Sequence, residues 1–331
     1  MRARAPQIRT MDDVKRVRPL VPGEAVPYAG AALTALRAEL SGTGAAVLGF
    51  VGAPFTLATY CVEGGTTSSY LNIKRLAWSE PATLHALLER LTDGVIAYVR
   101  YQADAGADVV QIFDSWGCNL HPNDWDVFSG PYVRRIVTEV KATHPRLPLI
   151  LYANGSGGML ERMAATGVDC VSVDQSVDIA DARARLGKDK AVQGNLDPGW
   201  LFGSKARACG AFGIRGLLGT CDVCAPPPPP AQDFIQRKVD ETVLKAGGHK
   251  HVLNLGHGAR TQLPDAPSHA PCRMHASEPA VVTRRRHAQH AGGQRGRLFR
   301  GGAYRARARA PLEGLWGLAR CCGASMLPVL S

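Results

Sequence analysis

Three short motifs contain residue types whose spacing could support chemistry. Residues 154–158, NGSGG, have the glycine content of a phosphate-binding loop, but they lack the Gly-Lys-Ser/Thr ending and the dinucleotide spacing, so they indicate a strand-to-helix turn. Cys221 and Cys224 form a single CxxC pair, and because a structural zinc ion needs four ligands, we do not expect a metal site. Residues 284–286 are three consecutive Arg that could bind nucleic acid phosphates, although no aromatic platform accompanies them.

A second group consists of hydrogen-bonding side chains that follow apolar runs: Tyr60, Ser115 and His257. Taken singly, each has an ordinary structural interpretation. A tyrosine in this position packs against a core, a serine caps or closes a turn, and a histidine forms structural hydrogen bonds within the fold. Their significance therefore depends on the elements that position them.

Short apolar runs alternate with helical patterns between residues 46 and 258. The runs are nearly continuous, as in parallel strands covered on both faces, and predict strands at 46–51, 107–113, 147–152, 168–173, 190–196 and 251–256. Apolar residues at helical spacing predict helices at 82–105, 131–142, 158–165, 178–186 and 233–246.

This alternation predicts an α/β protein with a parallel sheet. Almost every predicted strand ends in a polar or glycine-bearing turn, and Tyr60, Ser115 and His257 lie past three of these ends. Functional side chains at many successive strand ends are typical of a (β/α)8 barrel of the TIM type, whereas a doubly wound sheet concentrates them at one switch point. We therefore predict an incomplete (β/α)8 barrel, with about six of eight βα units present.

The positive charge is concentrated in the last part of the chain. The 331 residues carry a formal net charge of +11 and are 45% hydrophobic, which indicates a globular protein. Residues 259–331 contain twelve Arg, no Lys and three acidic residues, whereas residues 1–258 contain 27 basic and 25 acidic residues. We therefore predict a barrel domain at 1–258 and a basic, disordered tail at 259–331, with nucleic acid as an alternative partner of the tail.

Residues 206–232 interrupt the barrel pattern as an insertion. They include five consecutive Pro at 226–230, which could form a polyproline ligand. A sharper hypothesis is that the insertion and the tail are translated non-coding sequence, because a pyrimidine-rich splice acceptor encodes Pro and GC-rich DNA in a wrong frame encodes Arg, Ala, Gly and Pro. Sequencing the mature transcript tests this hypothesis, and retained codons for 206–232 would contradict it for that segment.

Cysteine usage and the first residues bear on the cellular compartment. The nine Cys show no regular spacing, and Cys61, Cys118 and Cys170 lie in apolar or turn surroundings, so we predict reduced thiols without a disulfide framework. No apolar run approaches the length of a membrane span, so we expect no membrane association. The opening MRARAPQIRT is basic but too short and too poor in Ser to indicate a transit peptide.

Five longer motifs occur in order along the chain: GFVGAPFTLATYCVEGG (49–65), QIFDSWG (111–117), LPLILYANGSGG (147–158), VQGNLDPGWLFGS (192–204) and NLGHG (254–258). Together they resemble the uroporphyrinogen decarboxylase family, and most closely its plastid type in plants and algae. The resemblance spans residues 8–205 and 233–258.

The resemblance implies a single-domain (β/α)8 barrel that forms a homodimer, resides in the chloroplast stroma and uses neither a metal nor an organic cofactor. It implies a carboxy-lyase that removes the four acetate carboxyl groups of uroporphyrinogen III as CO2, giving coproporphyrinogen III in haem and chlorophyll biosynthesis. The substrate's own protonated pyrrole can accept the electrons that CO2 leaves behind. The protein then needs only to hold the pyrrole NH groups, the developing cation and the substrate carboxylates.

Three site residues follow from the resemblance. Tyr60 would contact the reacting acetate arm through its hydroxyl, which makes it both the catalytic residue and a substrate-binding residue. Ser115 would donate a hydrogen bond to a substrate carboxylate, and His257 would bond another acetate or propionate. Each is expected just past the C-terminal end of a strand, where barrel sites are built.

Two family motifs have no counterpart in this sequence. One is the Arg-Gln-Ala-Gly-Arg-Tyr motif, and the other is the Phe-Ser-Asp-Ile motif, whose Asp carboxylate holds the pyrrole NH groups of the substrate in the family. Asp114 does not replace that carboxylate, because it belongs to a later strand, and Gln175 stands where the family usually has Trp. We therefore expect weak or no decarboxylase activity from this chain.

Two alternatives remain open: an inactive fragment with a nucleic-acid-binding tail, and a related barrel methyltransferase that uses a corrinoid and a zinc-held thiol. The methyltransferase would require a His-x-Cys ligand pattern at strand ends, which the sequence lacks.

Overall fold

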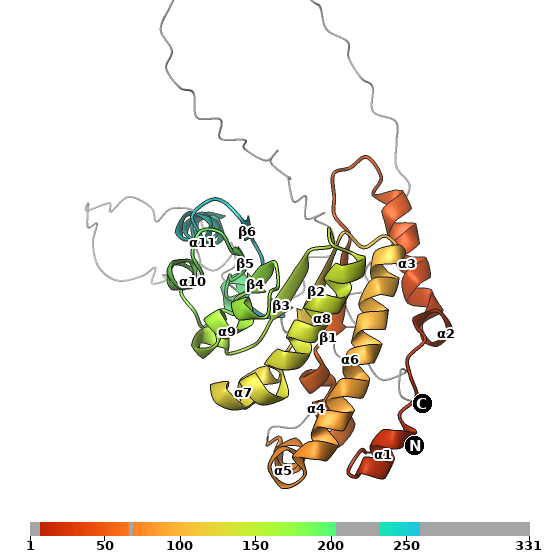
Figure 1. Ribbon diagram of the computed structural model, residues 1–331. Coiled ribbons are helices and arrows are strands. Elements are labelled where there is room, and N and C mark those ends of the chain that lie inside the picture. The colour runs from red at the N-terminus through yellow and green to blue at the C-terminus, as the bar shows by residue number, and fades with distance from the viewer. Residues whose placement is uncertain (1–6, 66–68, 203–231, 259–331) are drawn as a thin grey trace, which may run out of the picture. The chain divides into compact units, whose positions relative to one another are not determined.

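Six parallel strands form one sheet in the order β1-β2-β3-β4-β5-β6, which is also their order along the chain (Figure 1). The structure is a computed structural model and describes residues 7–65, 69–202 and 232–258, all of which belong to one compact unit. The strands are β1 (Leu48–Gly52), β2 (Val109–Phe113), β3 (Leu149–Tyr152), β4 (Cys170–Ser172), β5 (Ala191–Gln193) and β6 (His251–Val252).

Helices precede the sheet and connect its strands. In the described part of the chain the α-helices are α1 (Met11–Arg16), α2 (Pro22–Ala25), α3 (Pro27–Glu39), α4 (Pro54–Glu63), α5 (Leu71–Ser79), α6 (Pro81–Asp104), α7 (Pro122–Phe128), α8 (Gly130–Thr143), α9 (Leu160–Ala165), α10 (Ile179–Leu186) and α11 (Gln232–Lys245). Short 3-10 turns lie at η1 (Gly117–Asn119), η2 (Ser156–Gly158) and η3 (Pro198–Phe202).

The longest helix, α6, shows how the sequence pattern places a helix on the sheet. Pro81 lies in its first turn, where the missing N–H has no helical partner to lose. Its apolar residues recur every three or four positions, so they share one face and are buried: Leu84, Leu87, Leu88, Val95, Ile96 and Val99. Gly106, with a φ of +106°, then turns the chain into β2.

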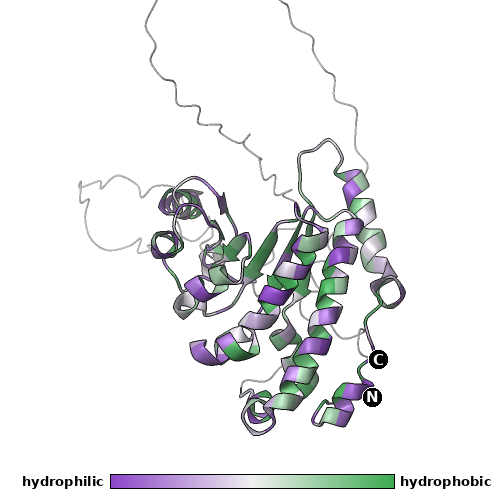
Figure 2. Cartoon of the chain, in the orientation of Figure 1, coloured by the Kyte–Doolittle hydropathy of each residue, from purple (hydrophilic) through white to green (hydrophobic). Residues whose placement is uncertain are grey.

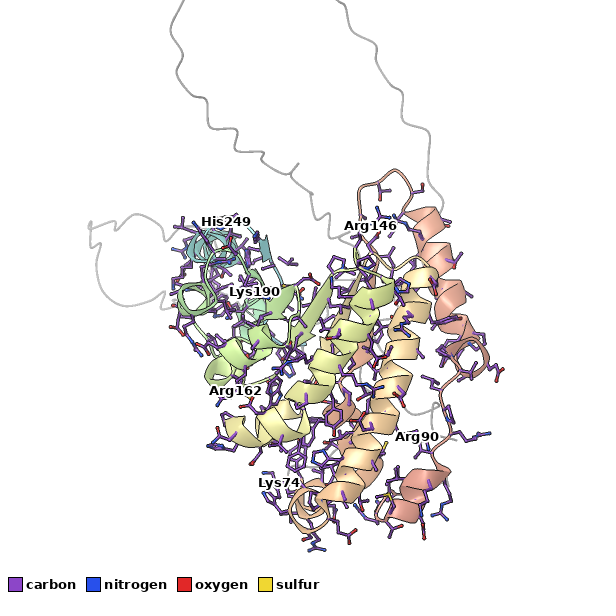
Figure 3. The ribbon with its side chains drawn as sticks, viewed as in Figure 1. Lys74, Arg90, Arg146, Arg162, Lys190 and His249 are labelled. Atoms are coloured by element: carbon purple, nitrogen blue, oxygen red, sulfur yellow. The ribbon has the colours of Figure 1, made fainter. Side chains whose placement is uncertain are left out.

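One face of the sheet is covered by helices. The strand residues on this face are fully buried: Val110, Ile112, Leu149, Leu151, Val171 and Val192. Helices α6 and α8 pack against each other over it, and Figure 2 shows their outward faces as polar while the strands behind them are hydrophobic. Polar pairs join neighbouring helices at the surface. Arg162, labelled on α9 in Figure 3, is one such residue, and its Nε donates to Asp126 Oδ2 on α7 at 2.9 Å.

The other face of the sheet is concave. Gln193 on β5 donates from Nε2 to Gln111 Oε1 on β2 and to Ser172 Oγ on β4, each at 3.0 Å. Because β3 and β4 separate β2 from β5, a direct bond between their side chains requires the sheet to curl. Tyr152 on β3 likewise donates to the carbonyl of Gly256 beyond β6, at 3.2 Å. The curvature and the sequential strand order match part of a (β/α)8 barrel and differ from a doubly wound sheet.

Strand β1 forms one edge of the described sheet, and α6 covers part of its backbone. Phe50 is half exposed, and its backbone N–H and C=O do not bond β2. Instead, the Gln102 Oε1 accepts from Phe50 N at 2.9 Å, and Gln102 Nε2 donates to Phe50 O at 3.1 Å. The buried Gln102 amide therefore satisfies backbone groups that a neighbouring strand would otherwise satisfy.

The six predicted strands and five predicted helices are confirmed, with boundaries that shift by a few residues. Residues 154–158 form the predicted turn, which leads from β3 through η2 toward α9. Cys61 and Cys170 are buried free thiols, and burial raises the pKa of each to about 12, while Cys118 is free and partly exposed. The sequence patterns did not predict α1, α2, α3, α4, α5 or α7.

Several predictions fall on residues that the structure does not describe. These are the CxxC pair Cys221 and Cys224, the five Pro at 226–230, the three Arg at 284–286 and the whole tail at 259–331. Of the insertion at 206–232, only Gln232 is described, at the start of α11. Within the described ranges, no helix combines the length and apolar composition needed to cross a bilayer.

Candidate active site at the strand ends

All six strands are parallel, so their C-terminal ends lie at one edge of the sheet. The segments that follow the strands at this edge contain the three predicted site residues and two buried carboxylates, Asp114 and Asp174. Each carboxylate follows an apolar strand and binds groups from neighbouring loops. The arrangement of this edge therefore depends on Asp114 and Asp174 as well as on the strands.

The sequence predicts that Tyr60 lies just past the end of β1, but the structure places it on α4. Ala53 ends the β1 segment and donates its N–H to Phe113 O at 2.8 Å, and Pro54 then starts the helix. Tyr60 comes in the second turn of α4, with a partly buried ring. That ring meets Trp116 edge to face, with a centroid distance of 5.9 Å. Helix α4 thus carries Tyr60 to the loop that follows β2.

Ser115 lies in that loop, immediately after Asp114 and before Trp116. The Asp114 N–H donates to Tyr152 O at 2.7 Å, which continues the pairing of β2 with β3. Ser115 is partly exposed at the strand-end edge, and its carbonyl accepts from Cys118 Sγ at 3.7 Å. Because Trp116 touches the Tyr60 ring, the structure brings Ser115 and Tyr60 into neighbouring positions.

An aromatic cluster borders these two residues. Tyr70, just before α5, packs on Trp116 with a centroid distance of 5.3 Å, and Trp116 also contacts Tyr60. Tyr70 has a φ of +54°, an uncommon conformation for a non-glycine residue that often occurs where a site constrains the backbone. The Asn72 side chain and the N–H groups of Asn72 and Ile73 bind the Glu63 carboxylate, which anchors the start of α5 to the end of α4.

The Asp114 carboxylate is fully buried and does not face the open edge. It accepts three hydrogen bonds, from Thr56 Oγ1 at 3.1 Å, Trp125 Nε1 at 2.8 Å and Ser129 Oγ at 2.7 Å. Burial raises the pKa of Asp114, and the bonds from Ser129, Trp125 and Thr56 oppose that shift. Gly117 must lack a side chain, because a Cβ there would lie 2.3 Å from Asp114 Oδ2.

The Asp174 carboxylate joins the loops after β3 and β4. Its Oδ2 accepts from Ser156 N at 3.1 Å, and its Oδ1 accepts from the N–H and hydroxyl of Ser176 at 2.8 and 2.5 Å. Asn195, after β5, donates from Nδ2 to the Asp174 carbonyl at 2.7 Å. Asp174 is 1% exposed, whereas Ser176 is exposed, and together these bonds link the ends of three successive strands.

His257 lies at the same edge and follows β6, whereas Tyr60 and Ser115 follow β1 and β2. Its imidazole is exposed, and Nδ1 is 3.2 Å from the Gly258 carbonyl oxygen. The preceding Gly256 is held tightly, since its N–H donates to Leu196 O at 2.8 Å and its carbonyl accepts from Tyr152 Oη at 3.2 Å. Burial raises the pKa of Tyr152, so its hydroxyl keeps the proton that it donates. The backbone beside His257 is therefore fixed while the ring faces solvent.

The sequence interpretation missed the residues that organise this edge: Thr56, Tyr70, Asp114 as a carboxylate that binds α4 and the turn between α7 and α8, and Asp174. A usable signal existed for the two carboxylates, since each follows an apolar run by at most two residues. No comparable signal marked Thr56, whose role depends on a contact 58 residues away.

The described residues also bear on metal binding and on cavities. No group of three or more His, Cys, Asp or Glu there is placed to hold a metal ion. A hollow of about 480 Å³ is lined by Asp240, Val243, Leu244, Gly247 and Gly248. It lies at the C-terminal end of α11 and precedes β6, so it belongs to the opposite end of the strand from His257.

Comparison with known proteins identifies the family. The sequence profile of the Uroporphyrinogen decarboxylase (URO-D) family matches residues 3–212. The chain is 52% identical over 258 residues to the chloroplastic uroporphyrinogen decarboxylase of Nicotiana tabacum, covering 78% of this chain and 59% of that protein. It is 52% identical to the uroporphyrinogen decarboxylase of Hordeum vulgare, covering 78% of this chain and 70% of that protein.

Bacterial proteins and a solved structure extend the comparison. The uroporphyrinogen decarboxylase of Crocosphaera subtropica is 47% identical over 260 residues, covering 78% of this chain and 66% of that protein. A methyltransferase from Methanosarcina mazei superposes with a TM-score of 0.58 at 19% identity, covering 79% of this chain and 66% of that chain, and this likeness supports the fold alone.

The extent of these matches defines what they establish. This chain spans between 57% and 70% of the length of the plant relatives that it matches. The identity of 52% over 78% of the chain and the match to the family profile are nevertheless sufficient to assign the family. The chain belongs to the uroporphyrinogen decarboxylase family.

Proposed function

We propose that the strand-end edge of this chain is the substrate site of a uroporphyrinogen decarboxylase. The reaction removes the four acetate carboxyl groups of uroporphyrinogen III and gives coproporphyrinogen III. The observation that carries the proposal is the contact between the Tyr60 and Trp116 rings, which places Tyr60 beside the loop of Ser115 in a chain of this family. Homologous proteins with this name support the choice of substrate.

The chemistry requires little of the protein besides positioning and charge stabilisation. The bond between the acetate methylene and its carboxyl breaks, CO2 leaves, and the electron pair moves into the protonated pyrrole. The methylene then takes up a proton and becomes a methyl group, and the ring releases the proton that it had gained, which restores the neutral pyrrole. In this proposal Tyr60 directs its hydroxyl at the reacting acetate, and Ser115 and His257 donate hydrogen bonds to other substrate carboxylates.

We also propose the finer points that the family suggests. The barrel domain occupies residues 1–258 with an insertion at 206–232, and the protein acts as a homodimer in the chloroplast stroma. The chloroplastic relatives from Nicotiana tabacum and Arabidopsis thaliana support the location. Size-exclusion chromatography with light scattering tests the dimer, and a mass equal to one chain would contradict it.

The proposed activity is tested with the purified full chain under anaerobic reducing conditions, with uroporphyrinogen III as substrate and porphyrin chromatography as the readout. Tyr60→Phe should lower kcat/KM by roughly 10-fold or more, because a hydrogen bond to a charged group contributes about 1.5–3 kcal/mol. Tyr28→Phe is the matched control, since Tyr28 is 60% exposed on α3.

Binding is measured separately, by substrate quenching of tryptophan fluorescence. Binding without product would show that the residues present hold the substrate but do not complete the reaction. If the folded chain shows no binding and forms no product, the proposed function is refuted. Equal effects of Tyr60→Phe and Tyr28→Phe on kcat/KM would remove Tyr60 from the site.

A further inference from the structure

The buried link between α4 and the loop after β2 has no direct access to a substrate. Asp114 is fully buried, and the side chains that bind it, Thr56, Trp125 and Ser129, are each at most 3% exposed. All three partners are neutral donors, and among the described residues no cationic side chain bonds this carboxylate. Any effect of this cluster on the reaction must therefore pass through the residues that it holds in place.

Thr56 connects the cluster to the site. Its hydroxyl donates to Asp114 Oδ1 at 3.1 Å and accepts from Trp116 N at 3.2 Å, so one oxygen bonds both ends of the loop segment 114–116. Tyr60 follows Thr56 by four residues on α4, which places both on the same face of the helix. On that face Tyr60 contacts the Trp116 ring at 5.9 Å.

These contacts join α4 to the loop at two points one helical turn apart. The first is the hydrogen-bonded link through Thr56, and the second is the ring contact of Tyr60 with Trp116. Ser115 lies between the two residues that Thr56 binds. The distance between the Tyr60 hydroxyl and the Ser115 side chain therefore depends on the position of Thr56 relative to Asp114.

We propose that Asp114 and Thr56 are positioning residues that set the spacing of Tyr60 and Ser115. This inference rests on the proposed function only for its kinetic consequence. The geometric claim is that Thr56 holds Trp116 against Tyr60, and structural measurements test it without catalysis. Asp114 itself contacts no substrate, and Trp125 and Ser129 serve to anchor its second oxygen to α7 and the start of α8.

The test uses Thr56→Val, which keeps the side-chain shape and removes both hydrogen bonds. Thr59→Val is the matched control, because Thr59 is 1% exposed on the same helix and its hydroxyl donates only to Phe55 O at 2.8 Å. We expect Thr56→Val to lower kcat by roughly 10-fold to 100-fold, since small misplacement of a reacting group is costly. Thr59→Val should stay within about twofold of the parent, and Thr56→Ser, which retains the hydroxyl, should restore kcat.

A double-mutant cycle separates positioning from general destabilisation. If Thr56 acts through Tyr60, adding Thr56→Val to Tyr60→Phe should lower kcat by less than about threefold further. Additive losses in kcat would overturn the positioning role, as would a loss shared equally by Thr59→Val.

A second readout does not need catalysis. The indole N–H signals of Trp116 and Trp125 in a nitrogen–proton NMR spectrum, assigned by single Trp→Phe variants, report on the cluster. Thr56→Val should shift the Trp116 signal, and Asp114→Asn should shift the Trp125 signal because it changes the group that Trp125 Nε1 bonds. Unchanged signals would overturn the geometric claim. Shifted signals in a folded chain that neither binds uroporphyrinogen III nor forms product would uphold it and refute the proposed function instead.

Discussion

A single methyl group at Gly256 should weaken the fold more than its size suggests. An added Cβ would lie 2.3 Å from Gln175 N and 2.8 Å from Gln175 Cα, and both atoms belong to the backbone. Side-chain rotation cannot relieve that overlap, so the segment after β6 must move away from the loop after β4. The same movement would weaken the bonds of Gly256 to Leu196 O and from Tyr152 Oη.

The size of the effect follows from these contacts. Overpacking of a well-packed site costs about 1–3 kcal/mol, and each hydrogen bond contributes about 1 kcal/mol net. We therefore expect Gly256→Ala to lower the free energy of unfolding by roughly 2–4 kcal/mol, or to lower Tm by roughly 4–16 °C for a domain of this size. Gly258→Ala is the control, because a Cβ there would meet nothing within 4 Å.

Urea unfolding followed by far-ultraviolet circular dichroism measures the difference between the two variants. The m-value should stay constant if only stability changes. A second measurement, limited proteolysis, should show earlier cleavage near residue 256 in Gly256→Ala than in Gly258→Ala, because the segment no longer packs on Gln175. Equal urea midpoints for the two variants would refute the reasoning, since it depends on a contact that only Gly256 makes.

Two further predictions concern the edge of the sheet and the acid limb of stability. Gln102→Leu should lower the free energy of unfolding by roughly 1–3 kcal/mol and promote aggregation, because it leaves the Phe50 N–H and C=O without partners at an open strand edge. Urea unfolding measures the loss of stability, and light scattering measures the aggregation. A loss of stability no larger than that of the exposed Gln236→Leu would contradict the prediction. Arg185 donates to both oxygens of Glu161 at 2.6 and 2.7 Å and lowers the pKa of Glu161 from 4.5 to about 2, so this pair stabilises the fold above pH 4.5 and loses that contribution as the pH falls toward 2. Glu161→Gln should flatten this part of the Tm-against-pH curve, and an unchanged slope between pH 4.5 and 2 would count against the pair.

The sequence alone determined the layout of the barrel. Continuous apolar runs located the strands, because a strand buried on both faces has apolar residues at nearly every position. Helical periodicity located the main covering helices, because each buries one stripe of apolar residues. It also supplied the family and the identity of the polar residues past the strand ends. Helix α4 was missed because its start, Pro54 and Phe55 after a strand, reads locally as a strand-end turn.

Only the tertiary structure decided how the strand-end residues relate to one another. Tyr60 meets Trp116 because α4 folds back over the loop after β2, while His257 stays exposed beyond β6. The buried carboxylate of Asp114 gains its role from Thr56, Trp125 and Ser129, which lie 58, 11 and 15 residues away in the chain. Hydrogen bonds between residues so far apart leave no periodic pattern in a sequence, and they form only when strand order and curvature bring the loops to one edge.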